Sequence, residues 1–116
     1  MNAFAEPEIE VTAEQTLAAL QEGRAQIVDI REPYEHEAGH IEGAEHIELE
    51  RLASNAERLD RDRPVIFYCR LGARSAMATQ AFRAAGWDAY SMRGGLGAWE
   101  AAGLPIAPEG GGVAPH

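Results

Sequence analysis

The chain has 116 residues, 46% of them hydrophobic, with 19 acidic and 10 basic residues and a net charge of −9. The length fits one domain with a real core, the acidity argues against nucleic acid as a partner, and no apolar run is long enough to cross a membrane. The one cysteine cannot form an internal disulfide and no secretory leader is visible, which together predict a reducing, cytoplasmic location.

Residues 1–8 form a loose lead-in, and residues 9–11 have the pattern of a short strand. Thr12 and Gln15 have the spacing of a capping box, in which each side chain caps the other residue's backbone N–H. A helix is therefore predicted from Thr12 to the helix-ending residue Gly23.

The next segment predicts a strand at residues 26–30, followed by a short helix that begins at Pro33 and ends at Gly39. A brief extended piece is expected at 45–48, and apolar residues recur at helical spacing over 49–59. Acidic residues concentrate in this segment, and we expect them to form a solvated surface: Glu32, Glu35, Glu37, Glu42, Glu45, Glu48 and Glu50.

The third part of the chain predicts a strand at 65–68, a helix at 76–85 and a strand at 89–92. Gly94-Gly95 then turns the chain into a short helix that carries Trp99. We expect Trp99 to be a core anchor, because a large aromatic side chain on a short helix needs an apolar partner surface.

Strands that alternate with helices predict an α/β fold with a mostly parallel central sheet and helices on both faces. Residues 9–106 form the domain, and residues 107–116 are rich in Gly and Pro, which is typical of a disordered tail. In such sheets, sites lie beyond the carboxyl ends of the strands, and Cys69 follows one of them.

The stretch Val65–Ser75 is the most informative part of the chain. Cys69 ends an apolar strand, and a loop with Arg70 and Arg74 follows before a helix that Ser75 caps. Backbone N–H groups and the dipole at a helix N-terminus favour a thiolate, and two guanidinium groups suit an oxyanion. The alternative is that Cys69 is only a small buried hydrophobe.

Three segments, in order, resemble the rhodanese-type sulfurtransferases. Cys69-Arg-Leu-Gly-Ala-Arg-Ser75 resembles their active-site loop, the segment 28–44 their N-terminal signature, and the segment 90–99 their C-terminal Gly-Gly-x-x-x-Trp signature. Two positions depart from the family pattern. Glu42 replaces a usual Pro in a turn, and Leu71 stands where some relatives carry a polar or cationic residue, which puts the sulfur donor in doubt more than the reaction class.

The resemblance implies a rhodanese-like fold and an enzyme that moves a sulfane sulfur from a donor such as thiosulfate to cyanide or a thiol. Cys69 would be the nucleophile and carry the sulfur as a persulfide. The loop residues would bind substrate: Arg70, Leu71, Gly72, Ala73, Arg74 and Ser75. Asp29 and Arg31 are expected to support the loop as an ion pair, and Arg74 either contacts the donor or braces the loop against an acidic residue. The resemblance calls for no cofactor and no metal.

Three other readings compete with this one. Cysteine phosphatases and arsenate reductases also place a Cys before an Arg loop, but Cys69 to Arg74 spans six residues, one fewer than in the phosphatase pattern. His36-Glu-Ala-Gly-His40 matches the zinc-hydrolase motif, yet Gly39 should end the helix that the motif needs. The domain could also be a persulfide carrier or docking module that hands sulfur to a protein partner. His46 and His116 carry no motif and are expected to be surface or partly buried structural residues.

Overall fold

The computed structural model describes residues 9–116 and shows one five-stranded, all-parallel sheet with the strand order β1-β5-β4-β2-β3. The lead-in, residues 1–8, lies outside the described residues. The strands are β1 (Glu10–Val11), β2 (Gln26–Asp29), β3 (Glu45–His46), β4 (Val65–Tyr68) and β5 (Ala89–Met92). Within the described residues, none of the helices has the length and apolar character needed to cross a bilayer.

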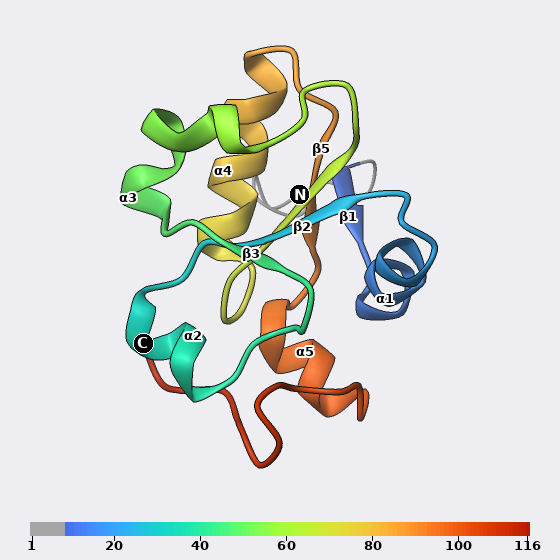
Figure 1. Ribbon diagram of the computed structural model, residues 1–116, viewed down its shortest axis with the longest axis vertical. Helices are drawn as coiled ribbons and strands as arrows, with labels where there is room; N and C mark the ends of the chain where they lie inside the picture. The colour runs from blue at the N-terminus through green and yellow to red at the C-terminus, as the bar shows by residue number, and fades with distance from the viewer. Residues whose placement is uncertain (1–8) are drawn as a thin grey trace.

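Helices cover both faces of this sheet (Figure 1). They are α1 (Ala13–Gln21), α2 (Pro33–Ala38), α3 (Leu49–Leu52), the 3₁₀ helix η2 (Ala53–Arg58), α4 (Ala73–Ala84) and α5 (Gly95–Ala101). The predicted α/β class, with a parallel sheet between helices, is confirmed.

The central strand β4 is buried on both faces, and its side chains alternate between two cores. Val65 and Phe67 belong to the cluster under α3, η2 and α4, whereas Ile66 and Tyr68 belong to the cluster under α1 and α5. A side-chain period of two produces this division, and burial on both faces explains why the strand has no polar alternation.

The capping box at Thr12 and Gln15 is confirmed, with Gln15 N donating to Thr12 Oγ1 at 3.0 Å and Thr12 N donating to Gln15 Oε1 at 2.8 Å. The helical pattern at 49–59, in contrast, splits into α3 and η2. The side chains of Ser54 and Asn55 both donate to the carbonyl of Arg51. These local bonds compete with the regular ladder, and Asn55 leaves helical geometry with φ −121°.

The prediction that Ser75 caps the helix after the thiol loop is wrong. α4 begins at Ala73, three residues earlier than expected, and Gly72 is its N-cap with φ 114°. This left-handed conformation favours glycine. Ser75 therefore lies inside the first turn of α4, where its hydroxyl donates to Gly72 O at 3.1 Å.

The segment predicted to be a disordered tail passes below α5 and ends beside α2 (Figure 1). Gly112 N donates to Ala38 O at 2.9 Å, and Val113 packs against the core cluster under α1 and α5. The composition of the segment explains the difference, because the same small residues that make a chain flexible also let it approach a helix closely.

Trp99 is 1% exposed, and its indole Nε1 donates to Pro105 O at 2.8 Å, so the expected core anchor is confirmed. We expect Trp99→Ala to lower the free energy of unfolding by about 3–5 kcal/mol, since it removes a large buried ring. Urea unfolding measures this change. The outcome that would contradict it is a loss below about 1 kcal/mol, the size of a typical surface substitution.

Candidate active site

Cys69 lies at the carboxyl edge of the sheet, directly after β4. Its side chain is 1% exposed, and it lines a pocket of about 220 Å³ together with residues of its loop, of α4 and of the tail. Cys69 is thus a buried member of the core cluster under α3, η2 and α4 that also lines this pocket. It lies at the base of an opening large enough for a small ligand.

Two backbone N–H groups converge on the sulfur of Cys69. Gly72 N lies 3.1 Å and Ser75 N lies 3.4 Å from Sγ, and the hydroxyl of Ser75 is 3.6 Å away. Both amides belong to the beginning of α4, a helix of twelve residues, so the helix dipole acts in the same direction. Amide donors at a helix N-terminus are a common arrangement of anion-binding sites.

The start of α5 holds the thiol loop in place. Leu96 N donates to Cys69 O at 2.8 Å, and Gly97 N donates to Arg70 O at 3.0 Å. Gly95 has φ 59°, and a Cβ there would overlap both carbonyl oxygens of the loop. This close approach gives the Gly94-Gly95 pair a structural role and links the third sequence signature to the cysteine.

Arg74 braces the loop against α2. Its two terminal nitrogens lie 2.9 and 3.0 Å from the two carboxylate oxygens of Glu35, which is 0% exposed. Burial alone would raise the pKa of Glu35, but the hydrogen bonds and charge of Arg74 outweigh it and lower that pKa below its ordinary value. Of the two roles left open for Arg74, the structure shows the ion pair.

Glu35 corrects the prediction of a uniformly solvated acidic surface between Glu32 and Glu50. Glu37, Glu42 and Glu50 are exposed, but Glu35 is buried with a fixed partner. The sequence does not distinguish Glu35 from the other acidic residues of this segment, because its partner Arg74 lies 39 residues away.

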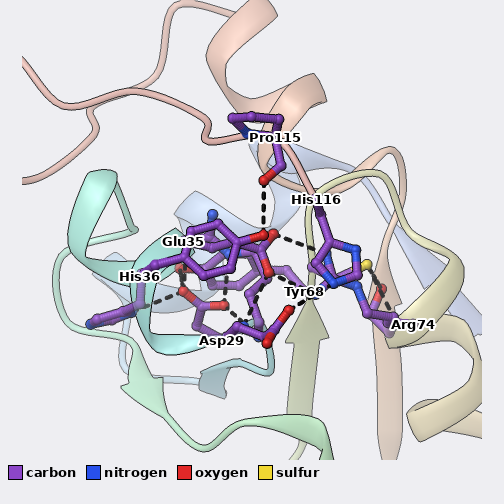
Figure 2. A network of polar contacts seen from close by, with 12 residues as sticks. Asp29, Glu35, His36, Tyr68, Arg74, Pro115 and His116 are labelled. Carbon is purple, nitrogen blue, oxygen red and sulfur yellow. Dashed lines mark hydrogen bonds and ion pairs between the residues drawn. The ribbon is translucent and has the colours of Figure 1, made fainter.

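Asp29 and Arg31 form the expected ion pair, wholly buried beneath the site. Arg31 donates from Nε at 2.8 Å and from a terminal nitrogen at 2.7 Å to the two oxygens of Asp29. Tyr68 Oη also donates to Asp29, at 3.0 Å, and His36 Nδ1 lies 2.9 Å from it (Figure 2). The sequence pattern does not predict this role of Tyr68, although a buried hydroxyl at the end of a strand indicates that a hydrogen-bond partner is needed.

Burial and neighbouring charges shift the pKa values of Asp29 and Tyr68 in opposite directions. Burial by itself would raise the pKa of Asp29, but hydrogen bonds and charge from Arg31 outweigh it and lower the pKa below its ordinary value. Burial, then the charge of Asp29, raises the pKa of Tyr68, so Tyr68 remains a hydrogen-bond donor. Asp29, Arg31 and Tyr68 support the fold below the pocket and do not line it.

Of the other predicted substrate-binding residues, Arg70, Leu71 and Ala73 line the pocket. Leu71 is 64% exposed at its rim. Among the described residues, no hydrogen-bond partner is found for Arg70 Nε, although this atom is buried. A buried donor without a partner is costly, so an anion in the pocket would complete the hydrogen bonding of Arg70.

The helix required by the zinc-hydrolase motif is too short, as the sequence analysis anticipated. α2 ends at Ala38, so His36 lies on the helix and His40 lies beyond it. The rings of His36 and His40 stack with centroids 4.0 Å apart, and His46 stacks on the other side of His36 at 4.3 Å. His40 Nδ1 bonds to His36 O at 2.7 Å. His46 Nε2 bonds to a main-chain carbonyl at 2.8 Å, which fits the partly buried structural role expected for it.

Comparisons with known proteins agree with this architecture. The family model described as "Rhodanese-like domain" matches residues 12–102. The chain is 40% identical over 77 residues to the protein YqhL of Bacillus subtilis, covering 66% of this chain but only 61% of that protein. It is 38% identical over 97 residues to a protein named thiosulfate sulfurtransferase GlpE of Pseudoalteromonas translucida, covering 79% of this chain and 89% of that one.

Solved structures give the same result. A rhodanese-related protein of Thermoplasma volcanium superposes with a TM-score of 0.78 at 26% identity, over 84% of this chain and 96% of its own. A protein of Rhodopseudomonas palustris described as a "possible tyrosine phosphatase" gives a TM-score of 0.73 at 31% identity, over 85% of both chains. Because the family model matches residues 12–102, which is most of the chain, the chain belongs to the rhodanese-like domain family.

Proposed function

We propose that this domain is a sulfurtransferase that takes a sulfane sulfur from a small anionic donor such as thiosulfate. The thiolate of Cys69 attacks the outer sulfur of thiosulfate. A sulfur–sulfur bond forms at Cys69, the bond between the two donor sulfurs breaks, and sulfite leaves with its electron pair. Cyanide or a thiolate then attacks the outer sulfur of the persulfide and releases the Cys69 thiolate.

The observation that carries the proposal is the environment of the sulfur. Gly72 and Ser75 donate to Sγ from the beginning of α4, and Arg70 lines the pocket above with a buried Nε that has no partner among the described residues. The amides stabilise the anionic nucleophile and its persulfide. The guanidinium suits the sulfonate oxygens of the donor.

Intact-mass spectrometry after incubation with thiosulfate tests the proposal directly. The expected result is a mass gain of one sulfur atom that is localised to Cys69 and lost on addition of cyanide, with thiocyanate as product. An unchanged mass after exposure to thiosulfate and to other sulfane-sulfur donors would contradict it. Because Cys69 is the only cysteine, the site of any modification is unambiguous.

A cysteine-phosphatase activity is the second candidate, and it is favoured by the likeness to the Rhodopseudomonas palustris protein described as a possible tyrosine phosphatase. A phosphoryl group on a cysteine needs cations around its oxygens. Here both terminal nitrogens of Arg74 are bonded to Glu35, which leaves less positive charge for a phosphoryl group. Release of phosphate from an aryl phosphate, without thiocyanate formation from thiosulfate and cyanide, would establish the phosphatase instead.

Arg70→Ala should raise the KM for thiosulfate about tenfold, with a smaller effect on kcat, because it removes a charged contact to the bound donor. Steady-state thiocyanate formation measures both constants. Arg63→Ala is the matched control, since Arg63 is an exposed arginine that lies outside this pocket. An unchanged KM in Arg70→Ala would remove Arg70 from the donor site.

The physiological acceptor decides whether the domain turns over alone or acts as a carrier. A small thiol is one candidate acceptor, and a protein thiol is the alternative for a persulfide carrier. Single-turnover transfer from the loaded protein, compared between cyanide and a reduced protein thiol, separates these cases. A cytoplasmic location, with no membrane or nucleic-acid partner, remains part of the proposal.

A further inference from the structure

The tail, residues 107–116, is attached to α2 and to the segment after it. Ala107 pairs with His40 through two backbone hydrogen bonds, each 2.8 Å long. Further along, Tyr34 Oη donates to Pro115 O at 3.0 Å. In Figure 1 the tail passes below α5 and returns to α2, so the end of the chain lies beside the carboxyl edge of the sheet.

The fit between the tail and α2 depends on glycine. A Cβ on Gly111 would lie 2.9 Å from Ala38 O and 2.8 Å from Pro108 O, closer than real Cβ atoms come to backbone oxygens. A Cβ on Gly112, by contrast, would have nothing nearer than Glu100 Oε2 at 3.7 Å. The tail therefore packs against α2 through close backbone contacts at specific glycine positions.

This path brings His116 to the pocket of Cys69, whose lining it shares with Arg70, Leu71, Ala73 and Arg74. His116 Nε2 lies 3.0 Å from Glu32 Oε2, and the ring is 40% exposed. Figure 2 shows His116 beside Arg74, on the side of the network nearer the helix that follows the thiol loop. From the sequence, His116 is expected to be a surface or structural residue, whereas the structure places it in the lining of the Cys69 pocket.

Charged side chains from two helices surround His116. Glu32 and Glu35 face it from α2, with one ligand atom of each residue and of His116 within 4.8 Å of one another. Arg74 faces it from α4, but its charge is balanced by Glu35. Glu32 accepts a hydrogen bond from Nε2 of the ring, and in a protonated imidazole the second N–H can bond to an anion in the pocket.

We propose that the tail is the outer wall of the Cys69 pocket and that His116 is an anion-binding residue of that pocket. The wall restricts access to a sulfur that is already at the base of the opening, and the ring favours small anions over neutral or bulky molecules. For the sulfur donor, this inference rests on the proposed function. The placement of the tail and of His116 at the pocket does not depend on the proposed function.

The charge of His116 is tested by alkylating Cys69 with iodoacetate, an anion, and iodoacetamide, its neutral analogue. Both reagents consume the same thiolate, so the ratio of their rates cancels the thiolate fraction and reports the charge of the pocket. His116→Ala should lower the ratio of iodoacetate to iodoacetamide roughly twofold to fivefold, the range for one partly exposed charge. His116→Arg should restore it.

Arg51→Ala is the matched control for charge, because Arg51 is an exposed cation on α3 and does not line this pocket. Its ratio should equal that of the unmodified protein, and added salt should reduce the effect of His116. A ratio that is the same in His116→Ala, His116→Arg and the unmodified protein would overturn the role of His116.

The wall is tested with Gly111→Ala and its neighbour Gly112→Ala. The first should displace the tail and raise the rate at which a bulky neutral maleimide labels Cys69 at least twofold. The second has room for its methyl group and should leave that rate unchanged. Equal rates in both variants and in the unmodified protein would overturn the wall, provided that melting curves show all three folded.

Thiosulfate loading separates this inference from the proposed function. A protein that takes up no sulfur from any donor, yet shows the expected alkylation ratios, refutes the sulfurtransferase and supports the anion-binding tail. A protein that loads sulfur with the same KM in His116→Ala, and shows unchanged alkylation ratios, supports the enzyme and refutes the role of His116.

Discussion

Cys69→Ser and Cys69→Ala should each lower sulfur transfer from thiosulfate to cyanide by about a thousandfold or more. The reaction requires a sulfur atom that can be attacked, loaded and unloaded, and no other residue of the chain supplies one, because Cys69 is the only cysteine. Removing a nucleophile that carries a covalent intermediate abolishes the two-step route, and only the small contribution of binding remains. Thiocyanate formation at saturating thiosulfate measures the loss.

The serine variant also keeps the fold testable. A hydroxyl at position 69 can accept the amide hydrogens of Gly72 and Ser75 as the sulfur does, so we expect a melting temperature close to that of the unmodified protein. Ser54→Ala is the control, since Ser54 is an exposed serine that lies outside the pocket and its loss should leave thiocyanate formation unchanged. Near-normal thiocyanate formation in the folded serine variant would refute Cys69 as the nucleophile.

The parts of this structure that sequence could predict are those fixed by local pattern. The capping box at Thr12, the apolar strand before Cys69 and the end of α2 before Gly39 follow from spacing, turn residues and capping chemistry within a few residues. Cys69 itself was identified because a strand end, a loop and a helix start adjoin one another in the chain.

The parts that sequence missed depend on pairs that are distant along the chain. The sequence assigns Glu35 to a solvated acidic surface because its partner Arg74 lies 39 residues away. It predicts a disordered tail because glycine content does not indicate the α2 surface that the tail contacts. The sequence predicts the start of α4 three residues too late for a different reason. The left-handed conformation of Gly72 allows the helix to begin inside the loop, so the serine that resembled a cap lies in the first turn.

The buried charge pair beneath the pocket should matter more to stability than any exposed pair. Asp29 and Arg31 are both 0% exposed, and Asp29→Asn would leave the guanidinium of Arg31 buried without a counter-charge. We expect the free energy of unfolding to fall by about 3–5 kcal/mol, the usual cost of removing one partner of a buried pair. Glu45→Gln is the matched control, because Glu45 pairs with Arg58 at the surface and should cost no more than about 1 kcal/mol.

Acid provides the second measurement, since protonation of Asp29 removes the same charge as the substitution. A carboxyl group whose pKa is lowered in the folded state stabilises the fold above its unfolded pKa, near 3.9, and this contribution is lost as pH falls through the folded pKa. Glu35 acts in the same direction. Urea unfolding at a series of pH values should therefore show a stability that falls below about pH 4, and fall less steeply in Asp29→Asn, in which one of these two carboxyl groups no longer titrates. Equal slopes in the two proteins would mean that Arg31 does not hold Asp29 ionised, and the support assigned to this pair beneath Cys69 would have to come from Tyr68 and the packing around it.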